Sequence, residues 1–329
     1  MNINNCSLNE NSKQLNVCIL INKQLYRNIL LKKIVQKHVL TFFNFSKITF
    51  FDKNNWFSVF SNACKSKIIF VIDLDGFLPF LFFSKQKNRV VSIPIDPISA
   101  YLSRAHNNSN ICILALNNIK ASNINDIIIK YCCTKFEGGR HLTRLSIMHN
   151  SFKNSKKIIK FNANCKRTIV LGSDHAGYNI KQTIIKHLTN HKYNVIDVGT
   201  FSQESTHYSL YAIAMMQHVK NAFCGIAICF TGFGIANTCN KFKGALSCIC
   251  SNVKQAKTAR EKYGANILAI GARNVTPNNV NRIVDAFIDS NQIKPNIHLL
   301  QLGYCFSYQY FSRLKIDKKL LPLELKKFS

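Results

Sequence analysis

Short apolar runs alternate with longer stretches of helical spacing along most of the chain. In the second half, runs of mostly apolar residues lie near 168–172, 193–197, 224–229, 245–250 and 267–270. The stretches between them, roughly ten to eighteen residues long, suit helices. Apolar strands separated by helices are typical of a parallel sheet that is covered on both faces. We therefore expect an α/β fold with five strands in this half.

The first half carries the same succession of patterns. Three of its apolar runs match three in the second half, namely 16–21 with 167–172, 67–73 with 224–229, and 110–114 with 266–270. The first run of each half leads into a segment with helical spacing. The repetition predicts two Rossmann-like domains, each with a five-stranded parallel sheet and helices on both faces.

The chain has 329 residues, which is enough for two domains that each bury a core. We assign residues 1–150 to the first domain and 168–298 to the second. The stretch 151–167 is polar and rich in Lys and Asn, so we interpret it as a linker. Residues 299–329 form a C-terminal extension for which the sequence suggests no role.

A formal net charge of +29 suggests nucleic-acid binding, because Lys and Arg neutralise phosphates. The lysines, however, are spread along the whole chain together with many Asn and Ile residues and form no basic patch. We therefore expect no nucleic-acid partner. The positive field would still draw a small anionic substrate toward a cleft.

No apolar run approaches the roughly 18 to 20 residues of a membrane-spanning helix, and residues 1–16 lack the apolar stretch of a secretory signal. We expect a cytoplasmic protein with no membrane partner. The 13 cysteines show neither zinc-ligand spacing nor the density of a small secreted scaffold. We expect nearly all of them to be reduced and buried.

A cysteine ends one predicted strand just before a glycine-rich turn. Cys229 is followed by Phe230 and then by Thr231-Gly232-Phe233-Gly234, at the strand end where open α/β sheets bind ligands. Backbone N–H groups of such a turn can hold an oxyanion and lower the thiol pKa from its free value of about 8.5. An isolated cysteine is more often packed in a core, and Thr231 also suits a helix cap. Both interpretations stay open at this point.

Asp174 and His175 follow another predicted strand end and should project into the same crevice. Asp174 equally suits the N-cap of a helix. In the first half, Arg140 and Arg144 lie four residues apart, on one helical face, where two guanidinium groups can grip a phosphate. The preceding Gly138-Gly139 pair favours a turn that directs a helix start at an anion. The alternative is a solvated basic face.

These motifs together resemble the type B ribose-5-phosphate isomerases and the related galactose-6-phosphate isomerases. In the second half the resemblance is carried by Gly172-Ser-Asp-His-Ala-Gly177, Asp197-Val-Gly-Thr200, Cys229-x-Thr-Gly-x-Gly234, Asn240-Lys-Phe242 and Asn266-Ile-Leu-Ala-Ile-Gly-Ala-Arg273. In the first half it is carried by Leu102-Ser-Arg-Ala-His-Asn107 and Phe136-Glu-Gly-Gly-Arg-His-x-x-Arg144. The resemblance therefore covers most of the chain twice.

The resemblance implies a homodimer with each active site between two subunits. One subunit supplies the Cys loop and the Asp-His loop, and the other supplies His-Asn and two arginines. The second half lacks the latter set, with Lys262-Tyr263, Asn296 and Leu300 at those positions. The first half lacks the former set, with Lys23-Gln24 and Asp73 in its place. Because the losses are complementary, we predict a covalent pseudo-dimer with one complete site, which could dimerise further.

Aldose–ketose isomerisation needs a base, donors for the enediolate, an acid/base that opens the ring, and a phosphate grip. The resemblance implies that Cys229 is the base and that His106 opens the ring. It assigns the remaining catalytic and substrate contacts to Thr231, Asp174, His175, Asn107, Arg140, Arg144, Gly232, Phe233, Gly234 and Tyr208. Of these, Asp174 would hold the sugar near its ring oxygen. No metal or organic cofactor is expected.

Several positions depart from the family pattern. Phe230 stands where glycine is usual, in a turn that could require positive φ. Ala236 and His207 replace polar or acidic residues, and Asn117 stands where a further phosphate-binding arginine is expected.

The leading hypothesis is an aldose–ketose isomerase of the pentose phosphate pathway that interconverts ribose 5-phosphate and ribulose 5-phosphate. The alternatives are a six-carbon sugar-phosphate isomerase and a catalytically inactive binding protein with an isomerase fold.

Overall fold

The computed structural model describes residues 17–40, 47–154, 159–162, 164–165 and 167–292. The described residues fold into two compact units: the first contains those up to Ser84 together with Asn88–Ser146, and the second contains Lys85–Lys87 together with those from Ile147 onward. Each unit is built around one five-stranded sheet.

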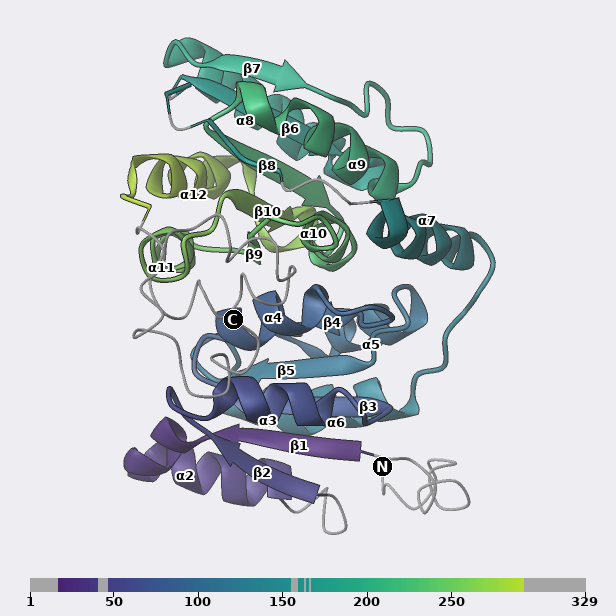
Figure 1. Cartoon of the computed structure of the whole chain (residues 1–329), viewed down its shortest axis with the longest axis vertical. Helices are drawn as coiled ribbons and strands as arrows, with labels where there is room; N and C mark the ends of the chain where they lie inside the picture. The colour runs from purple at the N-terminus through teal and green to yellow at the C-terminus, as the bar shows by residue number, and fades with distance from the viewer. Residues whose placement is uncertain (1–16, 41–46, 155–158, 163, 166, 293–329) are drawn as a thin grey trace, which may run out of the picture. The chain divides into compact units, whose positions relative to one another are not determined.

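The sheet of the first unit has the strand order β2-β1-β3-β5-β4, and all paired strands run parallel (Figure 1). Its strands are β1 (Val17–Asn22), β2 (Lys47–Phe51), β3 (Ile68–Asp73), β4 (Val91–Ser92) and β5 (Ile111–Ala115). The central strands β3 and β5 are buried almost throughout. Such burial is expected for parallel strands that have helices on both faces.

The first four helices of this unit connect its successive strands, and two more follow the last strand. They are α2 (Ile29–Val35), α3 (Trp56–Ala63), α4 (Phe77–Ser84), α5 (Pro97–Ala105), α6 (Ile124–Cys133) and the start of α7 (Arg140–Asn154), with shorter turns η3 (Lys23–Arg27), η4 (Gln36–Leu40) and η5 (Ala121–Asn123). A capping box fixes the start of α5, because Asp96 accepts from the Ser99 N–H at 2.6 Å and Pro97 occupies the first turn. The other end of α5 is capped by His106.

The sheet of the second unit has the corresponding order, β7-β6-β8-β10-β9, again with parallel pairs only. Its strands are β6 (Thr168–Ser173), β7 (Asn194–Asp197), β8 (Cys224–Cys229), β9 (Ser247–Ile249) and β10 (Ile267–Gly271). β8 and β10 are buried along their whole length. This explains why both segments are nearly continuous apolar runs in the sequence.

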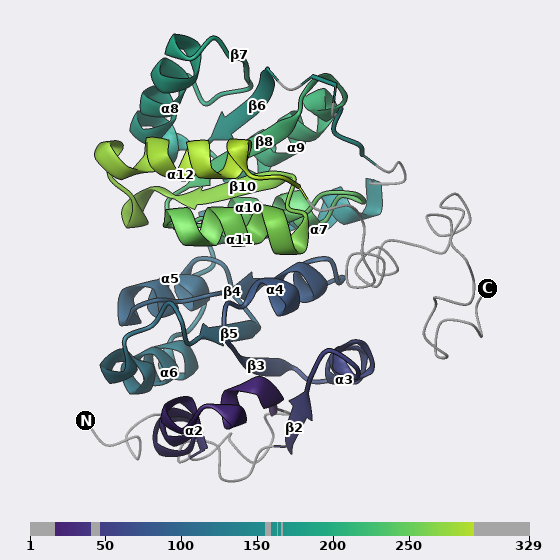
Figure 2. The ribbon, with the colours of Figure 1, turned by 90° about the vertical axis from the view of Figure 1, so that its left-hand side faces the viewer.

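Helices cover both faces of the second sheet. They are α8 (Tyr178–Asn190), α9 (Tyr208–His218), α10 (Phe233–Asn240), α11 (Val253–Tyr263) and α12 (Pro277–Asp289), with short turns η6 (His175–Gly177), η7 (Val219–Asn221) and η8 (Ala272–Asn274). Figure 2 shows α11 and α12 in front of the strands and α9 and α10 behind them. In this doubly wound arrangement the winding direction reverses between the carboxyl ends of β6 and β8, which is where open α/β sheets bind their ligands.

The predicted α/β fold with five parallel strands in each half is confirmed. The strands of the second half lie within two residues of their expected ends, although β9 is shorter than the predicted 245–250. No helix in the described part of the chain is long and apolar enough to span a bilayer. Ten described cysteines are free thiols, of which seven are buried, whereas Cys133 is disulfide-bonded. Asn296, Leu300, the extension 299–329 and parts of the predicted linker lie outside the described residues.

Candidate active site

In the second unit, two predicted site residues meet at the carboxyl ends of neighbouring strands. Cys229 is the last residue of β8, and Asp174 follows the last residue of β6. The parallel register pairs Ser173 with Ile228, and the Asp174 N–H donates to the Ile228 carbonyl at 3.2 Å. The neighbouring strand ends thus bring the thiol and the carboxylate close enough that the charge of Asp174 raises the pKa of Cys229.

Cys229 is a buried thiol, with only 3% of its surface exposed. Burial raises its pKa to about 12, and the charge of Asp174 acts in the same direction. Hydrogen bonds from backbone N–H groups of Ile235, Gly232 and Thr231 lower the pKa, as the sequence predicts, but they are outweighed. The expectation of a net lowered pKa is therefore wrong, because desolvation of the thiolate exceeds the effect of the turn.

The glycine-rich turn after β8 has one residue in the left-handed conformation, with positive φ. Gly232 has a φ of +81° and is the N-cap of α10. The Phe233 N–H donates to the Thr231 hydroxyl at 3.3 Å, so Thr231 does serve the start of this helix. Phe230 is not among the non-glycine residues with positive φ in the described part of the chain. Its replacement of the usual glycine therefore causes no backbone conflict, and its side chain is 45% exposed.

Tyr208 packs directly on the same turn. It is the first residue of α9 and is buried, and its ring fills the space where a Cβ of Gly234 would lie. Gly234 therefore allows a close approach of the ring to the first turn of α10. The structure brings the predicted contacts Gly232, Phe233, Gly234 and Tyr208 together around this helix start.

The Asp-His loop is held by its own hydrogen bonds. Asp174 is the N-cap of η6, and its Oδ1 accepts from the Gly177 N–H at 3.2 Å. The capping interpretation of Asp174 is thus correct, and it leaves the carboxylate beside Cys229. His175 Nδ1 accepts from the Thr206 N–H at 3.1 Å. In the neutral imidazole this places the proton on Nε2, which can donate to an anion.

In the first unit, the two arginines follow a glycine turn as predicted. Gly138 and Gly139 have φ values of +69° and +54°, and α7 begins at Arg140. Arg140 is exposed, whereas Arg144, one turn later, is only 8% exposed. Arg144 Nη1 lies 3.3 Å from Nδ1 of His141.

His106 and Asn107 lie at the end of α5, close to the same helix start. The ring of His106 stacks on that of His141, with centroids 4.2 Å apart and planes 12° from parallel. Burial lowers the pKa of His106, and Arg144 and Arg140 add to this, while Glu137 opposes it. Asn107 is buried, and its Nδ2 has no hydrogen-bond partner in the described structure. The first unit therefore gathers His106, Asn107, Arg140 and Arg144 in one region.

Three residues of this region, Glu137, His141 and Tyr101, were not identified as site residues from the sequence. Glu137 lies 3.5 Å from His106 and 3.7 Å from His141, and it accepts a 2.6 Å hydrogen bond from Tyr101. Glu137 and His141 stand within the quoted motif Phe136–Arg144, so their type and position were visible. Their contact with α5 is tertiary, and no spacing in the sequence predicts it.

The ligand atoms of His106, Glu137 and His141 lie within 4.8 Å of one another and form the candidate metal-binding group of the described residues. Two features favour an anion over a cation here. Burial lowers the pKa of both histidines, to about 4 in His141, and the nearby charges of Arg144 and Arg140 add to this; the same two positive charges would repel a bound cation. The two imidazole rings are also nearly parallel, so their nitrogen lone pairs lie in separate planes and do not converge on one metal ion.

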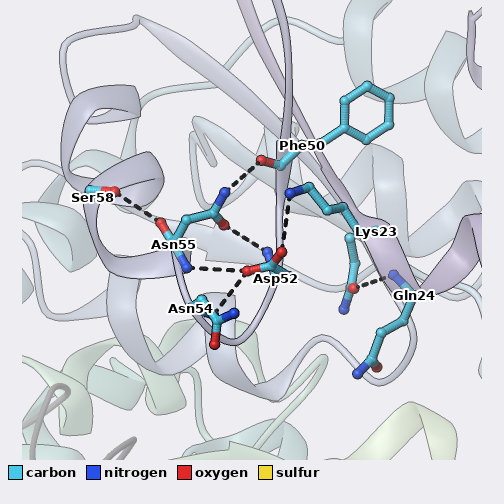
Figure 3. Close-up of polar contacts among 8 residues, drawn as sticks. Lys23, Gln24, Phe50, Asp52, Asn54, Asn55 and Ser58 are labelled. Atoms are coloured by element: carbon cyan, nitrogen blue, oxygen red, sulfur yellow. Dashed lines mark hydrogen bonds and ion pairs between the residues drawn. The ribbon is translucent and has the colours of Figure 1, made fainter. Parts of the chain in front are cut away.

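At the carboxyl ends of β1 and β2 in the first unit, polar side chains contact one another (Figure 3). Lys23, at a position where the resemblance implies Asp-His, lies 3.1 Å from Asp52. Asp52 also accepts from the Asn54 N–H at 2.9 Å, and its own N–H donates to Asn55 Oδ1 at 2.8 Å. The close-up shows Gln24 directed away from this group.

Asp73 ends β3, at the position that corresponds to Cys229. It is 4% exposed, and burial raises its pKa. Its oxygens accept from Asn22 Nδ2 at 2.5 Å and from the Gly76 N–H at 3.0 Å. In this unit the corresponding strand ends therefore carry a hydrogen-bonded carboxyl and an ion-paired lysine in place of a thiol and an Asp-His loop.

Comparison with known proteins gives the family. Ribose-5-phosphate isomerase B of Escherichia coli (strain K12) is 38% identical over 124 residues, which cover 83% of that protein and 37% of this chain. The galactose-6-phosphate isomerase subunit LacB of Clostridium acetobutylicum is 34% identical over 124 residues, covering 72% of that protein and 37% of this chain. The solved structure of Clostridium thermocellum ribose-5-phosphate isomerase B is 35% identical, with a TM-score of 0.41, and the match covers 99% of it and 44% of this chain.

The family described as ribose/galactose isomerase matches two segments of the chain, residues 64–148 and 169–298. The segments include the carboxyl ends of β3, β6 and β8, the glycine-rich turn and the start of α7. Together they make up more than half of the 329 residues. The chain therefore belongs to the ribose/galactose isomerase family.

Proposed function

We propose that this protein is an aldose–ketose isomerase that interconverts ribose 5-phosphate and ribulose 5-phosphate. Ring opening breaks the C1–O4 bond, with one proton delivered to O4 and one removed from the C1 hydroxyl, and we assign this step to His106. Cys229, as thiolate, then takes the C2 proton and returns it to C1 through an enediolate, while the O2 proton passes to O1. The observation that carries the proposal is the meeting of Cys229 and Asp174 at adjacent strand ends in a chain of this family.

The other predicted residues fit supporting roles. Asp174 would hold the sugar near its ring oxygen, and the buried Asn107 amide is suited to donate to an enediolate oxygen. Thr231 and the N–H groups of Gly232, Phe233 and Gly234 supply further donors, and Tyr208 shapes the turn. His175, Arg140 and Arg144 supply the positive and donor groups that a phosphate needs.

We further propose that a single chain supplies both residue sets to the reaction. The second unit has Lys262-Tyr263 where the family has His-Asn. In the first unit, Lys23 and Asp73 are engaged by internal partners. Each unit is therefore deficient in what the other carries.

The test is ribulose 5-phosphate formation by the purified full-length protein. We expect Cys229→Ala to lower kcat by about 10²- to 10⁴-fold, as expected for loss of the base. Cys165→Ala, which removes a half-buried free thiol of the same unit, should match wild type. No product above the Cys229→Ala background, together with no thermal shift by ribose 5-phosphate, would instead favour an inactive binding protein.

Mixing experiments test the single-chain arrangement. Equal amounts of His106→Ala and Cys229→Ala proteins should together remain inactive if one chain carries the whole site. Recovery of a substantial fraction of wild-type activity would show that sites are shared between chains.

A hexose phosphate is the second candidate substrate, because one relative is named a galactose-6-phosphate isomerase subunit. Comparing kcat/KM on ribose 5-phosphate and galactose 6-phosphate decides between them. We expect the pentose to be preferred.

A further inference from the structure

A carboxylate on the loop before α7 faces the Nε2 atoms of two stacked imidazole rings. Glu137 Oε2 is 3.5 Å from Nε2 of His106 and 3.7 Å from Nε2 of His141. The rings stack nearly parallel, with centroids 4.2 Å apart. The same carboxylate oxygen therefore faces the same nitrogen of both histidines.

Two contacts fix the position of this carboxylate relative to α5. The Tyr101 hydroxyl donates to Glu137 Oε1 at 2.6 Å. The backbone N–H of Glu137 donates to the carbonyl of Ala105 at 3.0 Å. Tyr101 and Ala105 both belong to α5, and His106 caps that helix. One helix thus holds both the imidazole and the group that faces it.

The other charged groups around His106 act in the opposite direction. Arg140 and Arg144 lie on α7, and their charges disfavour a proton on His106. His141 lies on the same helix, and its own pKa is lowered by burial and then by the charges of His106 and both arginines. The last carbonyls of α5 add a partial negative charge. Among these groups Glu137 is the full negative charge that favours the protonated imidazole.

We propose that Glu137 is a positioning residue for His106: its carboxylate orients the imidazole and favours a proton on Nε2, while Tyr101 keeps the carboxylate in place. The inference rests on the proposed function, in which His106 opens the sugar ring. Ring opening requires a proton to reach O4 as the C1–O4 bond breaks. A directed Nε2–H delivers this proton, and the nitrogen regains one from the C1 hydroxyl.

Two substrates separate this role from a general loss of structure. Ribulose 5-phosphate stays acyclic because its C5 oxygen is esterified, so proton exchange at its C1 needs the enediolate but no ring opening. We expect Glu137→Gln to lower kcat for ribose 5-phosphate by about 10- to 100-fold with little change in KM. Deuterium incorporation from solvent into ribulose 5-phosphate should stay within about twofold of wild type.

Two further variants complete the comparison. Tyr101→Phe should show the same pattern with a smaller loss, because the carboxylate is retained but less restrained. Asp126→Asn changes an exposed acid of α6 to its amide and should match wild type in both assays.

The imidazole gives a readout that does not depend on activity. In full-length protein labelled with ¹⁵N-histidine, the signals of His106 are those lost in His106→Asn. We expect the neutral ring of wild type to carry its proton on Nε2. Glu137→Gln should lower the His106 titration midpoint by about half to one pH unit, because a facing carboxylate is removed.

The proposal would be overturned by a Glu137→Gln protein that keeps the wild-type His106 titration and tautomer. Equal losses of ribose 5-phosphate turnover and of deuterium incorporation would also overturn it, since they indicate general damage. If wild type lacks isomerase activity altogether, the proposed function fails, and the titration still decides whether Glu137 orients His106.

Discussion

The environment of Cys229 determines the protonation state in which the site rests. Desolvation and the nearby Asp174 raise the thiol pKa to about 12 against three backbone N–H donors. At neutral pH the resting group is therefore a thiol, and the thiolate that the proposed mechanism uses as the base is a minor species. The fraction of thiolate rises tenfold for each pH unit below the pKa.

This predicts a pH–rate profile without a neutral optimum. Because kcat/KM reports the free enzyme, it should rise about tenfold per pH unit between pH 7 and 9 if Cys229 is the base. Initial rates of ribulose 5-phosphate formation across this range, with circular dichroism as a check on folding, measure the slope. A flat profile would indicate a different base or a thiolate already formed at neutral pH.

At the same scale, the sequence indicated which residues stand at the strand ends, but it did not indicate how deeply their side chains are buried or what they contact. Cys229 and Asp174 could be placed together because each follows a predicted strand of one parallel sheet. The direction of the Cys229 pKa could not be predicted, because it depends on how completely the thiol is buried. Glu137 was missed because its link to Tyr101 spans 36 residues.

At the scale of elements, buried parallel strands were the most readable part of the chain. β8 and β10 are continuous apolar runs because both faces of the sheet are covered. In the first half, β4 has only two residues, which is too short to give a periodic signal. The edge strand β7 is only partly buried and is not a continuous apolar run. Its Asp197 pairs with a buried lysine of α8.

That lysine gives a prediction for the stability of the second unit. Lys181 is fully buried and contacts both carboxylate oxygens of Asp197, at 2.7 and 2.5 Å. Asp197 also accepts from the Gly199 N–H at 2.9 Å, which ties β7 to the following loop. We expect Lys181→Met to lower the free energy of unfolding by about 3–5 kcal/mol, because it leaves a poorly solvated carboxylate without its counter-charge.

Urea unfolding followed by circular dichroism measures this loss. Lys186→Met changes an exposed lysine of the same helix and should stay within about 0.5 kcal/mol of wild type. The double variant Lys181→Met/Asp197→Leu should recover part of the loss, because both charges are then absent. If Lys181→Met were as stable as Lys186→Met, the ion pair between Lys181 and Asp197 would contribute nothing to stability.

At the scale of the whole molecule, the two sheets share one strand order, and the same family matches a segment in each half. This architecture was predictable because the hydrophobic pattern repeats along the chain. The chemistry does not repeat, as Asp73 and Cys229 at corresponding strand ends illustrate. The shared fold therefore does not decide which strand ends carry reactive side chains, and the residues at each strand end have to be considered one by one.

Thiols whose pKa is raised by burial or partial burial occur in both units and predict a molecule that is sensitive to alkali. Burial is the largest cause of a pKa raised to about 12 in Cys132, Cys224, Cys229 and Cys239. An unfolded thiol ionises near pH 8.5. The folded pKa is the higher one, so this contribution to stability is complete below about pH 8.5 and is lost as the pH rises toward 12. Each thiol should cost about 1.4 kcal/mol per pH unit in that window.

Four such thiols together would remove about 5 kcal/mol between pH 9 and 10, which is comparable to the whole stability of a domain. Melting temperatures measured from pH 7.5 to 10.5 under reducing conditions should therefore be level up to about pH 8.5 and then fall steeply. Cys239→Ala should be less stable at neutral pH because it opens a cavity. Above pH 9 it should show a shallower fall than wild type, since one buried thiol fewer resists ionisation. A melting temperature that stays constant through pH 10 would mean that these thiols become exposed to solvent without global unfolding.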